Sequence, residues 1–133
     1  MMPIPVIRAA LLGVGLTLAA AVAAQEPIDN CASLLGSLSV ELRYARKLSP
    51  SERTTFVCPR DTKALLGANK QRIVNSLGPP DATAAAEREG GGTLWSYYFG
   101  PSPAGPYPPG VPELRFEFDS HQVVFSVSCQ PTR

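Results

Sequence analysis

Apolar residues recur at steps of three and four along residues 31–47, and this spacing predicts a helix with one buried face. The charged side chains between residues 41 and 47 fall off that face. Pro50 ends the helix, because proline disfavours helical backbone at the residue before it. The apolar stripe consists of Cys31, Leu34, Leu35, Leu38, Leu42 and Ala45.

A second helix is marked within residues 67–80 by the signals at its two ends. Asn69 is suited to cap the N-terminus, and Gly78 followed by two prolines is suited to end the helix. The apolar residues expected on its buried side or beneath it are Leu65, Leu66, Ile73, Val74 and Leu77.

Three strands are predicted at residues 93–99, 113–118 and 122–129. The first is rich in aromatic residues, and the other two alternate apolar with polar side chains. A tight turn is expected at 119–121, and a flexible loop at 81–92. One buried and one solvated face is typical of an antiparallel sheet with helices on one side, so the expected class is α+β. The residues of the last strand expected to face inward are Val123, Phe125, Val127 and Cys129.

The segment 100–112 joins the first two predicted strands and holds six of the chain's 14 prolines. This proline content predicts an extended and fairly stiff loop. A long loop inside a compact domain is often functional. The loop is therefore the first candidate for a binding surface.

The first 24 residues have the order of a secretory signal peptide. Arg8 is followed by an unbroken run of small and apolar residues that ends in Ala21-Val22-Ala23-Ala24. The run is short for a membrane span, which needs about 20 residues. Gln25 and not cysteine follows Ala24, so we expect cleavage without a lipid anchor. Residues 25–133 are then predicted to be a single domain in the periplasm or outside the cell, with no membrane span.

Charge and residue chemistry narrow the function classes. The chain has 12 basic and 11 acidic residues without a basic cluster, which argues against a nucleic-acid or anionic-membrane partner. Asp119, Ser120 and His121 are residue types of a catalytic triad. The side chains of neighbouring residues in a turn, however, point in different directions. Those of a catalytic triad must point toward one another and form hydrogen bonds. The single histidine does not combine with the cysteines at zinc-site spacing. We therefore expect no catalytic residues, cofactor or metal, and no enzyme.

Export changes the expected state of the three cysteines, because an oxidising compartment favours a disulfide. Cys31 lies on the apolar stripe of the first helix, Cys58 precedes the second helix, and Cys129 lies in the last strand. A Cys31–Cys58 bond would close a loop of about 26 residues and contribute roughly 3 kcal/mol. We slightly favour this pairing over Cys58–Cys129, with the remaining cysteine as a buried thiol.

The order of motifs over about residues 63–129 resembles the SmpA/OmlA (BamE-like) family of outer-membrane assembly lipoproteins. The matching pattern is Gly67, a capping Asn69, the pair Ile73-Val74, Leu77-Gly78-Pro79-Pro80, Trp95-Ser96-Tyr97 and a final hairpin around Asp119. The resemblance implies two helices packed on one face of a three-stranded antiparallel meander, an α-α-β-β-β arrangement shared with β-lactamase-inhibitor-protein domains. The chain departs from the family in lacking the cysteine that carries the lipid.

The resemblance also implies function by protein–protein contact in the cell envelope. We therefore expect a soluble protein-binding or scaffold module, whose partner is another periplasmic or envelope protein and whose role is linked to envelope or outer-membrane assembly. The alternative is an inhibitor of a secreted hydrolase, by analogy with the inhibitor domains. The residues expected to contact a partner are Tyr98, Tyr107, Pro108 and Pro109.

Overall fold

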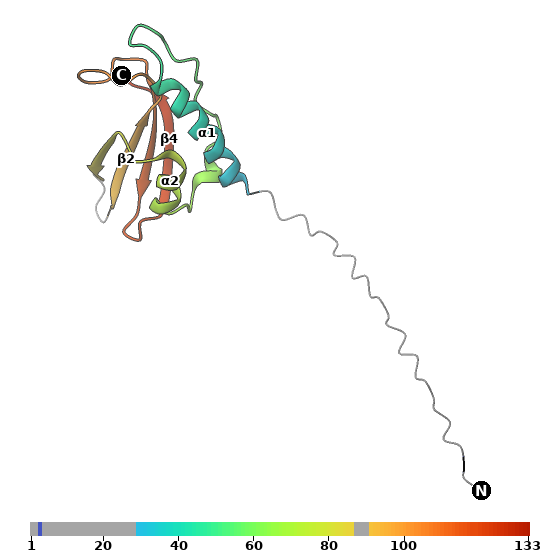
Figure 1. The fold of residues 1–133 in the computed structure, drawn as a ribbon. Coiled ribbons are helices and arrows are strands. Elements are labelled where there is room, and N and C mark those ends of the chain that lie inside the picture. The colour runs from blue at the N-terminus through green and yellow to red at the C-terminus, as the bar shows by residue number, and fades with distance from the viewer. Residues whose placement is uncertain (1–2, 4–28, 87–90) are drawn as a thin grey trace.

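Two helices cover one face of a four-stranded antiparallel sheet in the computed structural model (Figure 1). The structure describes residue 3 and residues 29–86 and 91–133. The elements are helices α1 (Asn30–Arg46) and α2 (Lys70–Leu77), the 3-10 helix η1 (Lys63–Leu65), and strands β1 (Ala82–Ala85), β2 (Thr93–Tyr98), β3 (Pro112–Phe118) and β4 (Val124–Pro131), in the sheet order β1-β2-β3-β4. The predicted α+β class is confirmed, whereas the expectation of three strands is wrong.

Both helices begin at a side-chain cap, and the predicted cap at Asn69 is confirmed. The Asp29 side chain accepts a hydrogen bond from the backbone N–H of Ala32 (3.1 Å), and that of Asn69 accepts one from Arg72 (2.8 Å). The Arg72 guanidinium in turn pairs with the Asp29 carboxylate, which links the start of α2 to the start of α1. Gly78 ends α2 with a φ of 80°, a backbone region that favours glycine.

The core lies between the helices and the inner face of the sheet, and it contains the apolar stripe of α1. Leu66 differs from its expected place beneath α2, because its side chain is 48% exposed while that of Leu65 is fully buried. Fully buried side chains come from every layer of the fold: Leu35, Leu38, Leu42, Leu65, Ile73, Tyr97, Phe99, Leu114, Phe116, Phe118 and Val124.

Strands β2 and β3 form the centre of the sheet and supply most of its buried rings. Tyr97 lies opposite Leu114, and Trp95 lies opposite Phe116. The Tyr97 hydroxyl donates a hydrogen bond to the carbonyl of Gly78 (2.8 Å), so its buried polar atom is satisfied at the end of α2. Burial raises the pKa of Tyr97, and the phenol therefore stays neutral in the folded protein.

Strand β1 was not predicted from the sequence, which indicated a loop over 81–92. In the structure Ala82 pairs with Ser96 and Ala85 with Thr93, and Ala86 donates a backbone hydrogen bond to Gly92 (3.1 Å). All four residues of β1 are exposed, so no alternation of apolar and polar side chains marks the strand. Its residues also have low β propensity apart from the threonine. Backbone pairing alone therefore defines this edge strand.

A β-bulge changes which residues of β4 face the core. Phe116 pairs with Val127 and Glu117 with Ser126, but the register shifts so that Phe118 pairs with Val124. The extra residue reverses the in–out alternation on the N-terminal side of the bulge. Val124 is therefore buried to 2% exposure, whereas the predicted inward residues Val123 and Phe125 are only partly buried.

A bulged strand and a regular strand predict different losses of stability for substitutions at positions 123 and 124. Val124→Ala is expected to lower the free energy of unfolding by about 2 kcal/mol, because it removes buried methyl groups and leaves a cavity. Val123→Ala is expected to cost less than half as much. Urea denaturation of the two variants measures the difference. The opposite order would show that β4 keeps the regular alternation and that the bulge is wrong.

The disulfide joins Cys58 to Cys129, with their Cα atoms 5.5 Å apart. The expected preference for Cys31–Cys58 is thus wrong, and the alternative pairing is confirmed. Cys129 lies opposite Leu114 on the inner face of the sheet, where the segment between α1 and η1 reaches it. Cys31 is free and partly buried, and it packs against the core from the first turn of α1. The long connection between the helices is therefore tied to the last strand.

The predicted signal peptide lies outside the described residues, apart from Pro3. Within the part of the chain that the structure describes, no helix has the length and apolar character needed to cross a membrane.

Candidate functional site

The proline-rich loop 100–112 is held against the sheet at several points. At its base, Phe99 donates a backbone hydrogen bond to the carbonyl of Pro112 (2.9 Å). Its second arm pairs with Thr132 after β4, which exchanges backbone bonds with Gly110 and Val111 (2.9 and 2.8 Å). The Thr132 hydroxyl also donates to the carbonyl of Pro108 (2.8 Å). Backbone and side-chain bonds thus fix the arm that carries two exposed prolines.

The structure brings together the two tyrosines that were expected to contact a partner. The ring of Tyr107 stacks on that of Tyr98, with centroids 4.1 Å apart and planes 16° from parallel. Burial raises the pKa of both phenols, and nearby acidic groups add to this effect, Glu113 at Tyr98 and Asp81 at Tyr107. Both rings are therefore neutral at physiological pH. The stacked pair anchors the tip of the loop to β2.

The start of β1 supports the same anchor. Asp81 accepts a hydrogen bond from the backbone N–H of Tyr98 (2.8 Å) and forms an ion pair with Arg46 at the end of α1 (3.0 Å). One carboxylate thus links the first helix to the strand that carries the tyrosine stack. The tyrosine stack that anchors the loop therefore lies where α1, β1 and β2 are joined.

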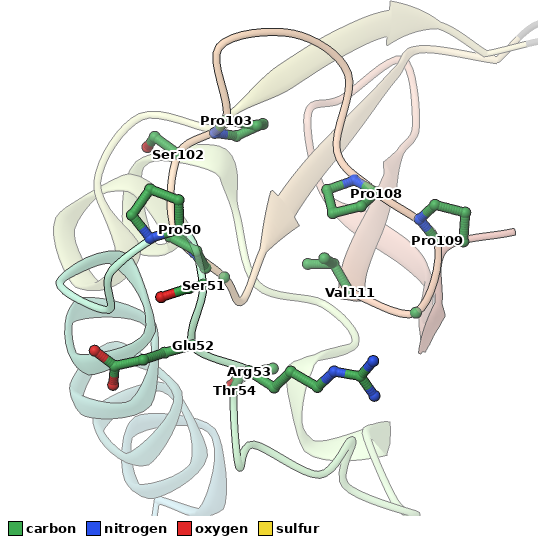
Figure 2. Close-up of a pocket in the computed structure, with 13 residues that line it drawn as sticks. Pro50, Ser51, Glu52, Arg53, Thr54, Ser102, Pro103, Pro108, Pro109 and Val111 are labelled. Carbon is green, nitrogen blue, oxygen red and sulfur yellow. The ribbon is translucent and has the colours of Figure 1, made fainter.

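A cavity of about 550 Å³ lies between the loop and the segment that follows α1 (Figure 2). This volume is within the range of about 300–1,000 Å³ that is typical of ligand pockets. The loop supplies both of its arms, and residues 50–54 supply the facing wall. The lining residues are Pro50, Ser51, Glu52, Arg53, Thr54, Gly100, Pro101, Ser102, Pro103, Pro108, Pro109, Gly110 and Val111.

Residues 50–54, which form the facing wall, are held in position by the contacts of the residues that follow them. The ring of Phe56 stacks on that of Phe99, with centroids 3.9 Å apart and planes 10° from parallel. Cys58 is then bonded to Cys129. At the opposite wall, a Cβ on Gly100 would lie 3.1 Å from a methyl carbon of Val111, so glycine allows the close approach of the two arms there. Packing at both walls therefore defines the width of the cavity.

Sequence reasoning identified one wall of this cavity and missed the other. Pro108 and Pro109 were expected to meet a partner, and both are exposed. No binding role was predicted for residues 50–54, which follow the end of the first predicted helix. The signals that could have revealed them are Phe56 and Cys58, an aromatic residue and a cysteine that need partners in the core.

A second hollow of about 320 Å³ lies on the outer face of the sheet, over the small side chains of β1. Its charged groups are already paired, because Glu113 accepts hydrogen bonds from Ser96 (2.7 Å) and Arg115 (3.2 Å). The ion pair is partly exposed and contributes little to stability. This hollow offers less free polar chemistry than the proline-lined cavity.

The residues 119–121 form the turn that the sequence predicts. The Asp119 carboxylate accepts hydrogen bonds from the backbone N–H groups of His121 (2.8 Å) and Val123 (3.1 Å), and His121 is exposed. The carboxylate therefore holds the hairpin and does not orient the imidazole. Among the described residues, no group of three or more His, Cys, Asp or Glu side chains is arranged to hold a metal ion.

Comparisons of the chain with protein-family models, with curated proteins and with solved structures found no match. The function proposed below rests on the geometry of the loop and the cavity, together with the sequence patterns described above.

Proposed function

We propose that the chain is an exported protein-binding or scaffold module of the cell envelope, which captures another periplasmic or envelope protein at the proline-lined cavity. The observation that carries the proposal is that a stiff loop with exposed prolines is fixed on the sheet and faces a second loop across a cavity of about 550 Å³. We further propose that the fold is of the SmpA/OmlA (BamE-like) type, extended by one edge strand.

The physical argument for binding is pre-organisation. Association costs free energy when loops and side chains become ordered, and a surface that is already rigid avoids much of that cost. Proline has few backbone conformations to lose. The tyrosine stack and the bonds to Thr132 hold the loop before a partner arrives. Exposed Pro108 and Pro109 then form the contact, with Tyr98 and Tyr107 as its support.

Two observations support export. The chain starts with the pattern of a cleavable leader. The Cys58–Cys129 disulfide suits an oxidising compartment, because reducing conditions inside cells keep most thiols free.

The proposal predicts that replacing three of the loop prolines strongly reduces partner capture without unfolding the protein. The triple variant Pro103→Ser, Pro108→Ser, Pro109→Ser is expected to recover roughly tenfold less partner, because it disrupts the centre of the contact. The measurement is affinity capture from envelope extracts, with the tag placed directly after Ala24.

The matched control is Pro79→Ser, since Pro79 is an exposed proline that does not line the cavity. It is expected to capture the partner as the unchanged protein does. Circular dichroism must show the same fold for all three proteins. Equal recovery by the triple variant contradicts the proposed function. Recovery of a secreted hydrolase in inhibited form would instead assign the inhibitor role.

A further inference from the structure

The cavity lining contains a cation that pairs with no acidic group of the described residues. Arg53 lines the cavity and is exposed, and none of the ion pairs among the described residues includes it. The neighbouring Glu52 is already engaged, because it accepts hydrogen bonds from the hydroxyl and the backbone N–H of Ser49 (2.7 and 3.4 Å). Figure 2 shows the Glu52 carboxylate pointing toward α1 and the Arg53 side chain extending toward the arm with Pro109. The lining thus holds one carboxylate and one guanidinium, and it is the guanidinium that lies toward the proline-rich loop.

Prolines make up a large part of the remaining lining, beside the hydroxyl groups of Ser51, Thr54 and Ser102. Five of the lining residues are prolines, which keep a backbone carbonyl but have no N–H. Their rings give the walls apolar patches. A well-matched occupant therefore supplies N–H donors, an apolar or aromatic side chain and a negative charge. Aromatic rings and proline rings are also complementary in the grooves that recognise proline-rich peptides.

We infer that the cavity binds an extended acidic segment of the partner protein, in which a carboxylate pairs with Arg53 and a neighbouring aromatic side chain lies between the proline walls. The backbone N–H groups of a peptide can donate hydrogen bonds to carbonyl groups of the lining. The inference rests on the proposed function and specifies the chemistry of the segment that is captured.

The guanidinium favours a carboxylate for geometric reasons as well as for its charge. Arginine presents a planar fork of donors that matches both oxygens of a carboxylate. The balanced charge of the chain disfavours nucleic acid, whose binding depends on several neutralised phosphates. A single arginine without an acidic partner among the described residues, placed beside proline rings, instead suits one anionic side chain.

The test uses protein purified from expression of the full coding sequence and labelled with ¹⁵N. The probe is a pool of acetylated hexapeptide amides with Phe, Tyr or Trp at the third position, Glu at the fourth, and mixed residues elsewhere. The matched pool carries Gln instead of Glu. We expect the acidic pool to shift the amide resonances of Arg53, Gly110 and Val111, and to bind about tenfold more tightly than the Gln pool, because a charge-assisted bond is lost.

Arg53→Gln is expected to remove the preference for the acidic pool, and Arg53→Lys to restore part of it. Equal affinity for the two pools, or no shift of the cavity amides by the acidic pool, overturns the inference. Binding of an acidic oligosaccharide such as trigalacturonic acid, without binding of the peptides, also overturns it.

Partner capture separates this inference from the proposed function. If Arg53→Gln captures the partner normally and the triple proline variant does not, only the inference fails. If the triple proline variant also captures the partner normally, the proposed function fails as well.

Discussion

Replacing Cys58 and Cys129 together by alanine is expected to lower the free energy of unfolding by about 4 kcal/mol. The two cysteines are 71 residues apart, and a crosslink over such a long loop strongly restricts the unfolded chain. The effect is a large part of the stability of a small domain, which is typically about 5–15 kcal/mol. Urea denaturation at neutral pH measures it.

Cys31→Ala is the matched control, because this thiol is free and only partly buried. It is expected to cost about 1 kcal/mol or less. Non-reducing peptide mapping of the unchanged protein should recover Cys58 linked to Cys129 and Cys31 as a thiol. A map that links Cys31 to either cysteine, or a Cys31→Ala variant as unstable as the double variant, contradicts this account.

Phe99→Ala is expected to lower the free energy of unfolding by about 4 kcal/mol, within the range for a fully buried phenylalanine. Phe99 has no exposed surface, and its ring stacks on Phe56. The substitution leaves a cavity and also removes the contact that positions residues 50–54. We therefore expect loss of stability together with loss of the proline-lined cavity.

Thermal and urea unfolding report the stability, and faster amide exchange at Arg53 and Thr54 reports the release of the wall. The control is Val57→Ala, because Val57 follows Phe56 directly but is 82% exposed. Its stability should stay within about 0.5 kcal/mol of the unchanged protein. A Phe99→Ala variant with unchanged exchange at the wall would show that the Phe56 stack does not place it.

Both helices could be predicted from the sequence because their information is local. Each has an apolar stripe of helical spacing and a capping side chain at the correct position, as Asn69 and Gly78 show for α2. The two central strands were predicted for a similar reason. Their buried aromatic and leucine residues, such as Tyr97 and Phe116, mark one face of a sheet.

The features that could not be predicted depend on contacts between distant parts of the chain. Strand β1 buries no side chain, so its formation depends only on pairing with β2. The bulge follows from the register between β3 and β4, and alternation along β4 alone indicated the wrong inward residues. All three cysteines were expected to approach the core, so the sequence could not show which pair lies at bonding distance.

The candidate site shows the same division. Composition identified the proline-rich loop, and the wall at 50–54 appeared only when Phe56 and Cys58 were placed. Tyr98 and Tyr107 were expected on the contact surface, and the structure places them against each other. A pair of aromatic residues can anchor a loop as readily as it can meet a partner, and sequence alone does not separate the two.

The most direct test of the binding surface is site-specific photo-crosslinking in the cells that produce the protein. A benzophenone amino acid is introduced at position 103 or 108 on the loop, or at position 40 or 130 as controls, since Val40 and Gln130 are exposed and do not line the cavity. The account predicts one discrete crosslinked partner from positions 103 and 108 and none from the two controls. Crosslinking from position 40 with none from the loop would contradict it.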